Sequence, residues 1–118
     1  MTEAVMQANR FDFEALRASA DKASSLMKSM ANADRLMLLC QLSQGERSVG
    51  ELENILDIRQ PTLSQQLTVL REAALVSTRR EGKNIFYSIS SSSALAIMRV
   101  LSQQICNHNE WAWKLTYP

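Results

Sequence analysis

Residues 48–72 read SVGELENILDIRQPTLSQQLTVLRE, and this stretch decides the fold. Ser48 and Glu51 have the spacing of a capping box, which predicts a short helix that begins there and ends near Asp57. A second helix is expected to begin with Pro61 at its first helical position, where the missing N–H of proline costs no hydrogen bond. Two short helices joined by about three residues predict a helix-turn-helix.

The residue pattern changes after this motif. Residues 75–80 and 85–89 alternate in character, and their β-branched and aromatic side chains predict two strands. Residues 81–84, EGKN, lie between them and are typical of a hairpin tip. A hairpin that directly follows the second helix of the motif makes it a winged helix.

Three further helices complete the expected order. The first carries an apolar face at spacings of three and four residues: Phe13, Leu16, Ala20, Ala23, Met27 and Met30. Asn32 is expected to cap the second, with Asp34 in its first turn, and Gly45 to end it. The last carries Ala94, Met98, Leu101 and Ile105. The sequence therefore predicts a mainly α fold with a small β-hairpin (α+β), a winged helix-turn-helix in the order ααααββα.

Composition excludes several classes of protein. The chain has 118 residues, 46% hydrophobic and 21% charged, which is typical of one globular domain. It has no long apolar run and no signal-peptide pattern, so we expect a cytoplasmic protein without a membrane partner. It has no Gly-rich phosphate loop and a single His, which argues against an enzyme. We expect no cofactor.

Polar side chains cover one face of the second motif helix. Four residues are expected to point inward: Leu63, Leu67, Leu70 and Ala74. Five lie on the other side or at the N-terminal end: Gln60, Thr62, Ser64, Gln65 and Thr68. Short neutral donors and acceptors suit base edges and phosphates in the major groove, and recognition helices use their N-terminal residues for this purpose. A solvated helix face would have the same composition.

Basic residues gather around the hairpin tip, at Arg79, Arg80 and Lys83. They are local charges in a chain whose net charge is only +1. In a wing they would neutralise phosphates or enter a minor groove of double-stranded DNA. Two alternatives remain: a charged tip that keeps a sheet edge soluble, and a winged helix that binds a protein instead of DNA.

These segments together resemble the ArsR/SmtB family of winged-helix regulators, over roughly residues 20–107. The resemblance rests on residues 30–36 (MANADRL), 48–52 (SVGEL), 60–67 (QPTLSQQL), 70–72 (LRE), 79–83 (RREGK) and 85–87 (IFY). It implies a homodimer formed by the first and last helices, which binds an inverted-repeat operator as a repressor.

The resemblance also implies how the chain is divided. We expect an N-terminal extension at residues 1–10, a DNA-binding and dimerisation domain at residues 11–108, and a C-terminal tail at residues 109–118.

The two cysteines, Cys40 and Cys106, are either inert core residues or a redox pair. Their positions resemble those of the dithiol branch of the family. That likeness implies that low-molecular-weight persulfides, polysulfides or oxidants link the two thiols and release the DNA. The family also contains metal sensors and anti-silencers, in which case the cysteines would be structural. We expect no metal site, because His108 with scattered carboxylates does not supply a ligand set.

Overall fold

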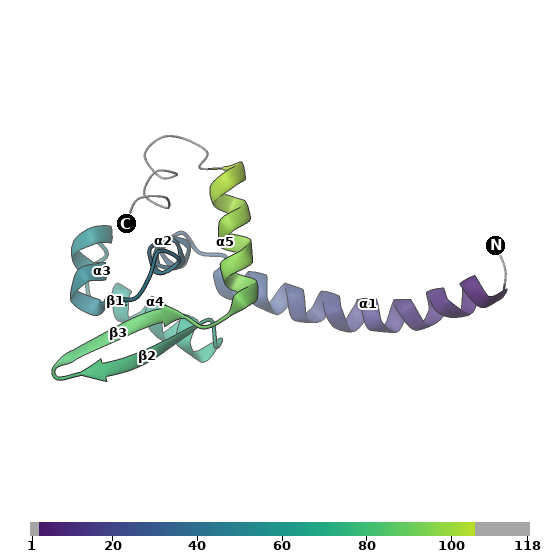
Figure 1. Cartoon of the computed structure of the whole chain (residues 1–118), viewed down its shortest axis with the longest axis horizontal. Coiled ribbons are helices and arrows are strands. Elements are labelled where there is room, and N and C mark those ends of the chain that lie inside the picture. The colour runs from purple at the N-terminus through teal and green to yellow at the C-terminus, as the bar shows by residue number, and fades with distance from the viewer. Residues whose placement is uncertain (1–2, 106–118) are drawn as a thin grey trace.

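The computed structural model describes residues 3–105, and their side chains from residue 12 onward. The helices are α1 (Glu3–Met30), α2 (Ala33–Leu42), α3 (Val49–Leu56), α4 (Thr62–Glu72) and α5 (Ser92–Gln104) (Figure 1). The strands are β1 (Arg47–Ser48), β2 (Val76–Glu81) and β3 (Asn84–Ile89). This confirms the expected order with one addition, because the strand β1 was not predicted.

The core surrounds α2, which packs against α3, α4, α5 and β3. Six leucines are its most buried large side chains: Leu38, Leu39, Leu52, Leu63, Leu67 and Leu70. They come from α2, α3 and α4, so the two motif helices are held by the same apolar cluster. Full burial of a leucine contributes about 1.5–3 kcal/mol, which makes this cluster the main stabilising element of the fold.

The predicted ends of α2 and α3 are confirmed with one exception: α2 ends at Leu42, with Ser43 as its C-cap, and not at Gly45. Asn32 Oδ1 accepts a hydrogen bond of 3.1 Å from the backbone N–H of Arg35. Ser48 and Glu51 form the complete capping box, with bonds of 2.9 and 3.1 Å. Asp57 ends α3 in the left-handed conformation, at φ 54°.

Two details at the ends of α4 differ from the expectation. Pro61 is the N-cap and not the first helical residue, because its carbonyl accepts the first intrahelical bond, from Gln65 N–H at 3.0 Å. Ala74 does not point inward: α4 ends at Glu72 with Ala73 as its C-cap, and Ala74 is exposed with φ 60°. The buried position that follows the helix is taken by Leu75, which is 4% exposed.

The sheet has the order β1-β3-β2 and is antiparallel. Gly82 and Lys83 form a two-residue turn between the paired residues Glu81 and Asn84. Gly82 has φ +63°, which matches the glycine at the first central position of a type II′ turn. The short strand β1 pairs with the middle of β3, where Ser48 lies opposite Phe86. The wing is therefore joined to the residues that begin α3.

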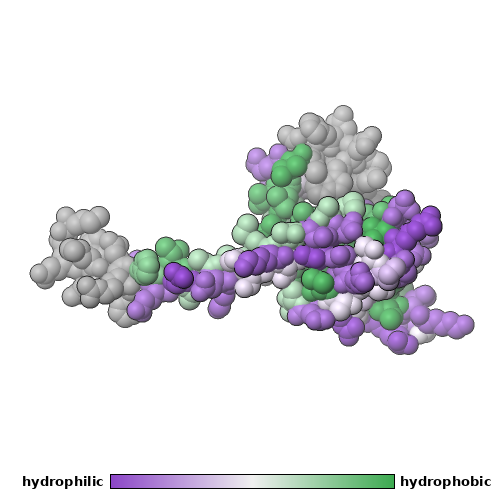
Figure 2. Space-filling view, turned by 180° about the vertical axis from the view of Figure 1, so that it is seen from behind, coloured by the Kyte–Doolittle hydropathy of each residue, from purple (hydrophilic) through white to green (hydrophobic). Residues whose placement is uncertain are grey.

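Helix α1 projects from the rest of the chain, and the principal extents are 61 × 32 × 22 Å (Figure 1). On the face predicted from its periodicity, Phe13, Leu16 and Met27 are each more than 60% exposed, and only Met30 is buried. On α5 and directly after it, Val100 and Ile105 are also exposed. Figure 2 shows hydrophobic residues along α1 and at the end of α5. Among the described residues, no helix is long and apolar enough to cross a membrane.

Candidate nucleic-acid interface

The five polar residues predicted for the recognition helix are all exposed, whereas Leu63, Leu67 and Leu70 on the other side of α4 are buried. The five are Gln60, Thr62, Ser64, Gln65 and Thr68. The predicted orientation of α4 is thus confirmed apart from Ala74. An exposed row of amides and hydroxyls at the start of a helix is what reading of base edges requires.

Three of these side chains bond to each other or to the backbone. Gln60 Oε1 accepts hydrogen bonds from the backbone N–H of Ser64, at 3.2 Å, and from its hydroxyl. Thr68 Oγ1 donates to the carbonyl of Ser64 at 2.8 Å. Gln60 therefore acts as a cap that Pro61 does not provide. Within the described part of the chain, the side chains of Thr62 and Gln65 make no hydrogen bond, which leaves them to contact a partner.

A groove of about 470 Å³ lies between α4 and the wing. Its lining comes from α4, the N-terminus of α3 and the hairpin: Ser64, Leu67, Thr68, Val49, Gly50, Lys83, Asn84, Ile85 and Tyr87. The recognition helix and the tip of the wing thus border one groove, whose rim carries the cationic Lys83 and two hydroxyls. This arrangement suits a phosphate backbone that passes between helix and wing.

Arg79 is engaged within the protein. Its Nε and Nη2 donate to the two carboxylate oxygens of Glu46 at 2.8 and 2.7 Å, and its Nη1 donates to Glu81 at 2.6 Å. The guanidinium also lies 4.6 Å from the ring centroid of Phe86, directly opposite on β3. The hydrogen bonds from Arg79 hold the pKa of the Glu46 carboxyl below its usual value, and the two carboxylates raise the pKa of Arg79.

Arg80 lies on the opposite face of the hairpin. Side chains alternate along a strand, so Arg80 shares a face with its partner Ile85 and with Tyr87, both of which line the groove. Arg80 and Lys83 are exposed, and neither forms an ion pair with another described residue. The two adjacent arginines therefore differ: Arg79 is balanced by carboxylates, and Arg80 presents its charge on the groove side.

Of the predicted sulfur-sensing pair, only Cys40 belongs to the described residues. It is 2% exposed on α2, and its carbonyl accepts a hydrogen bond of 2.6 Å from the hydroxyl of Ser43. Cys106, His108 and the tail at residues 109–118 lie outside the described residues. Among the residues described, no group of three or more His, Cys, Asp or Glu side chains has the geometry of a metal site.

Glu46 and the strand β1 are the parts of this site that sequence reasoning missed. Glu46 precedes Arg79 by 33 residues, and β1 is two residues long, too short for an alternating pattern. The only local signal was Gly45, which was expected to end α2 and has φ +145°. Its turn places Glu46 and β1 beside the hairpin.

Comparison with known proteins extends these observations. The family described as "Bacterial regulatory protein, arsR family" matches residues 32–78, from the N-cap of α2 into β2. A biofilm growth-associated repressor from Agrobacterium fabrum is 52% identical over 81% of this chain and 82% of its own length.

Solved structures agree with this match. The crystal structure of the transcriptional repressor BigR from Xylella fastidiosa has a TM-score of 0.75 and 45% identity, covering 79% of this chain and 95% of that one. Reduced HlyU from Vibrio cholerae has a TM-score of 0.76 and 41% identity, covering 79% and 98%. The match therefore includes the helix-turn-helix, the wing and most of the remaining fold.

Proposed function

The chain belongs to the ArsR family of bacterial regulatory proteins, and we propose that it acts as a homodimeric repressor of an inverted-repeat operator. It is a winged-helix transcriptional regulator and not an enzyme. The relatives from Agrobacterium fabrum and Xylella fastidiosa are named as repressors, which supports repression as the outcome of binding. Since bacterial operator DNA lies in the cytoplasm, this activity belongs there.

The observation that carries DNA binding is the groove between α4 and the wing. We assign five exposed polar side chains to the major groove of the DNA: Gln60, Thr62, Ser64, Gln65 and Thr68. Arg80 and Lys83 are assigned to DNA phosphates or to the flanking minor groove of the DNA. Arg79 joins this interface only through the N–H groups that its carboxylate partners leave open, in an orientation which those partners fix.

Dimerisation is supported by the exposed apolar side chains of α1 and α5. The stretch from Phe13 to Met27 spans about 21 Å of helix, and in a single chain Phe13, Leu16 and Met27 are each more than 60% exposed. Pairing of the same face with its copy across a two-fold axis would bury both copies. The test is sedimentation: Leu16→Glu is expected to yield monomers, whereas Glu14→Gln, on the same helix, leaves the dimer. A wild-type protein that sediments as a monomer would contradict the assignment.

We propose further that the cysteine pair senses reactive sulfur species or oxidants. Helix α5 packs on α2, which carries the buried Cys40. The buried positions Ala94, Met98 and Ser102 of α5 follow one another every four residues, and Cys106 is the next position in that series of the sequence. A covalent link there would join α2 to the end of a dimerisation helix and couple the thiols to DNA affinity.

The chemistry of the link needs only a persulfide. Because Cys40 is buried, we assign the first attack to Cys106, whose thiolate takes the sulfane sulfur and expels the carrier as a thiolate. The Cys40 thiolate then attacks the Sγ of that persulfide and expels hydrosulfide, which forms the S–S bond. With an oxidant, the two thiols instead lose two electrons and two protons.

The experiment is a gel shift with the protein's own promoter, before and after treatment with an organic persulfide, with intact mass measured in parallel. Release of DNA with a mass change that maps to Cys40 and Cys106 is the expected result. Cys40→Ser and Cys106→Ser should bind DNA and remain bound after treatment. Binding that neither cysteine affects would overturn the sulfur switch, and absence of binding in every condition would overturn the DNA-binding assignment.

A further inference from the structure

The guanidinium of Arg35, near the start of α2, joins the end of α1 to the recognition helix. Its Nε donates a hydrogen bond of 2.6 Å to the carbonyl of Ser29, and its Nη2 donates one of 3.3 Å to the carbonyl of Lys28. Its Nη1 donates one of 2.8 Å to Oε1 of Gln66 on α4. Its backbone N–H is held by Asn32, so Arg35 is fixed at both main chain and side chain.

Helix α1 favours this arrangement. The last four carbonyls of a helix have no intrahelical partner and carry the negative end of its dipole, and α1 ends at Met30. A guanidinium presents its N–H groups in a rigid planar fork. The two bonds to α1 therefore fix the direction in which Nη1 meets Gln66, and a rotation or shift of α4 relative to α1 would break that bond.

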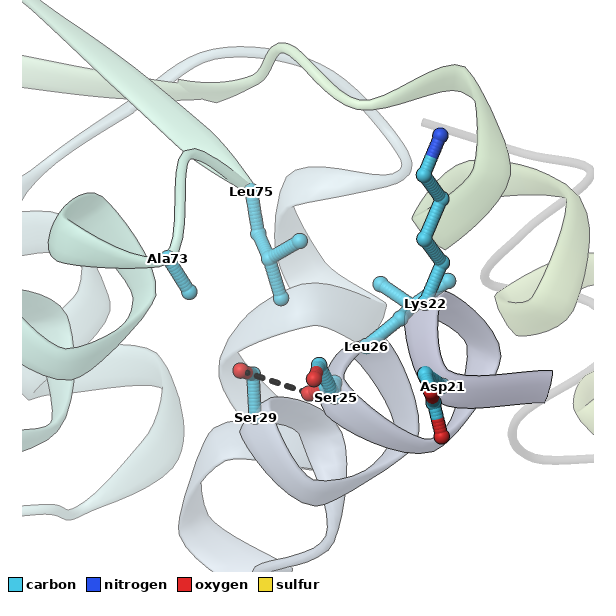
Figure 3. Close-up of a pocket in the computed structure, with 7 residues that line it drawn as sticks. All are labelled: Asp21, Lys22, Ser25, Leu26, Ser29, Ala73 and Leu75. Atoms are coloured by element: carbon cyan, nitrogen blue, oxygen red, sulfur yellow. Dashed lines mark hydrogen bonds between the residues drawn. The ribbon is translucent and has the colours of Figure 1, made fainter. Parts of the chain in front are cut away.

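Packing alone does not fix the same orientation. A cavity of about 490 Å³ opens between α1 and the segment that follows α4, and Figure 3 shows the side chains of Ala73 and Leu75 across it from α1. Ser29, which accepts the bond from Arg35, lines this cavity. Near this junction, α1 buries Met30 and half-buries Leu26. The Arg35–Gln66 hydrogen bond thus fixes the orientation of α4 at a place where a cavity, and not close packing, separates α1 from the segment after α4.

We propose that Arg35 is a positioning residue that sets the orientation of α4 relative to α1, and thereby the spacing between half-sites that the dimer accepts. This rests on the proposed function, a dimer that binds an inverted repeat. A helix shift of about 1–2 Å in each protomer is doubled across the two-fold axis. It then approaches the roughly 3.4 Å rise of one base pair, so a small change at this tie alters which spacing fits best.

The test compares operators that differ only in spacing. The promoter's inverted repeat is used as found and with one base pair removed or added between the half-sites, and affinity is measured for each. The wild type is expected to prefer one spacing. Arg35→Gln and Gln66→Ala are expected to reduce that preference roughly fivefold or more, while the preference for the half-site sequence stays. Gln66→Glu keeps an acceptor for Arg35 and should retain the spacing preference.

Matched controls separate this role from general damage. Arg71→Gln removes an exposed guanidinium from α4, the helix that carries Gln66, and should leave the spacing preference unchanged. Gln65→Ala should alter sequence preference but not spacing preference. Thermal unfolding of each variant identifies any that fail to fold.

A second measurement needs no DNA. Spin labels at Lys22 on α1 and at Glu72, the last residue of α4, report the distance between these two helices. The labelled protein lacks both native cysteines and is diluted with unlabelled protein. Arg35→Gln is expected to broaden the distance distribution. Folded Arg35→Gln and Gln66→Ala variants with the wild-type spacing preference overturn the proposal. If the wild type binds no inverted repeat, the proposed function fails, and an unchanged distance distribution then overturns the role of Arg35.

Discussion

Both carboxylate oxygens of Glu46 lie within 2.8 Å of the guanidinium nitrogens of Arg79, so the wing is anchored to the residue just before β1. Glu81 adds a second carboxylate and Phe86 a ring against the same guanidinium. The face of the hairpin that carries Arg79 thus holds one cation against two anions. The charge that remains to attract DNA on the wing comes from Arg80 and Lys83, on or near the groove.

The contact between Glu46 and Arg79 predicts whether the substitution of Glu46 raises or lowers the affinity for DNA. Glu46→Gln removes a negative charge from the wing, and electrostatics alone would make DNA binding tighter. Because Glu46 anchors Arg79, we expect instead that the wing loosens and that affinity falls roughly twofold to fivefold, the range expected for an exposed ion pair. Fluorescence anisotropy with operator DNA at one fixed salt concentration measures the change. Glu72→Gln, an exposed carboxylate at the end of α4, is the control, and tighter binding by Glu46→Gln would contradict the anchoring role.

The two arginines should also differ in how they affect salt dependence. Arg80→Gln is expected to reduce the slope of log K against log salt by about 0.9, the value for one phosphate contact on B-DNA. Arg79→Gln should change the slope by a clearly smaller amount, because its charge is balanced by Glu46 and Glu81. The measurement is affinity over a series of salt concentrations. Equal slope changes for the two variants would mean that Arg79 leaves its partners on DNA.

Gln65 is expected to determine sequence choice. Its side chain is exposed and makes no hydrogen bond within the described residues, so its amide is available to an adenine edge. Gln65→Ala should cost about 1–3 kcal/mol at one base pair of each half-site and relax the preference there. Binding to a panel of single-base operator variants measures this. Gln60→Ala, which removes the cap on Ser64, should lower stability as well, and an unchanged panel for Gln65→Ala would exclude the assigned face.

Stability should fall in acid for a reason visible in α3. The backbone N–H of Ser48 donates to the Glu51 carboxylate and holds its pKa below the usual 4.5, and Arg79 does the same for Glu46. A carboxyl whose pKa is lowered by folding adds stability above its unfolded pKa, and this is lost as pH falls through the folded pKa. We expect the free energy of unfolding to decrease as the pH drops below about 4.5, and we expect the decrease to be smaller in Glu51→Gln. Urea unfolding across the acidic range tests this, with Glu72→Gln as control.

Features formed by residues close together in the sequence were predicted, whereas contacts between residues far apart in the sequence were missed. The capping box of Ser48 and Glu51 spans three residues, and both of its hydrogen bonds are present. The buried face of α4 follows from periodicity and is correct up to the last turn. Arg79 was predicted from its charge alone, because nothing local indicates that Glu46 lies beside it. The tie between Arg35 and Gln66 spans 31 residues and was missed for the same reason.

The end of α4 offers the last prediction, because Ala74 occupies a conformation that alanine does not favour. Its φ of 60° lies in the left-handed region, which costs an L-residue roughly 1–2 kcal/mol and costs glycine almost nothing. Ala74 is exposed, so removal of its methyl group leaves no cavity. Its backbone N–H donates a hydrogen bond of 3.0 Å to the carbonyl of Arg71, and any residue except proline can keep this bond.

Ala74→Gly should therefore raise the free energy of unfolding by about 0.5–1 kcal/mol, after the larger chain entropy of unfolded glycine is subtracted. Denaturant unfolding measures it, and the exposed helical residue Ala96 gives the control: Ala96→Gly should destabilise by a similar amount. A loss of stability in both variants would show that Ala74 is not strained.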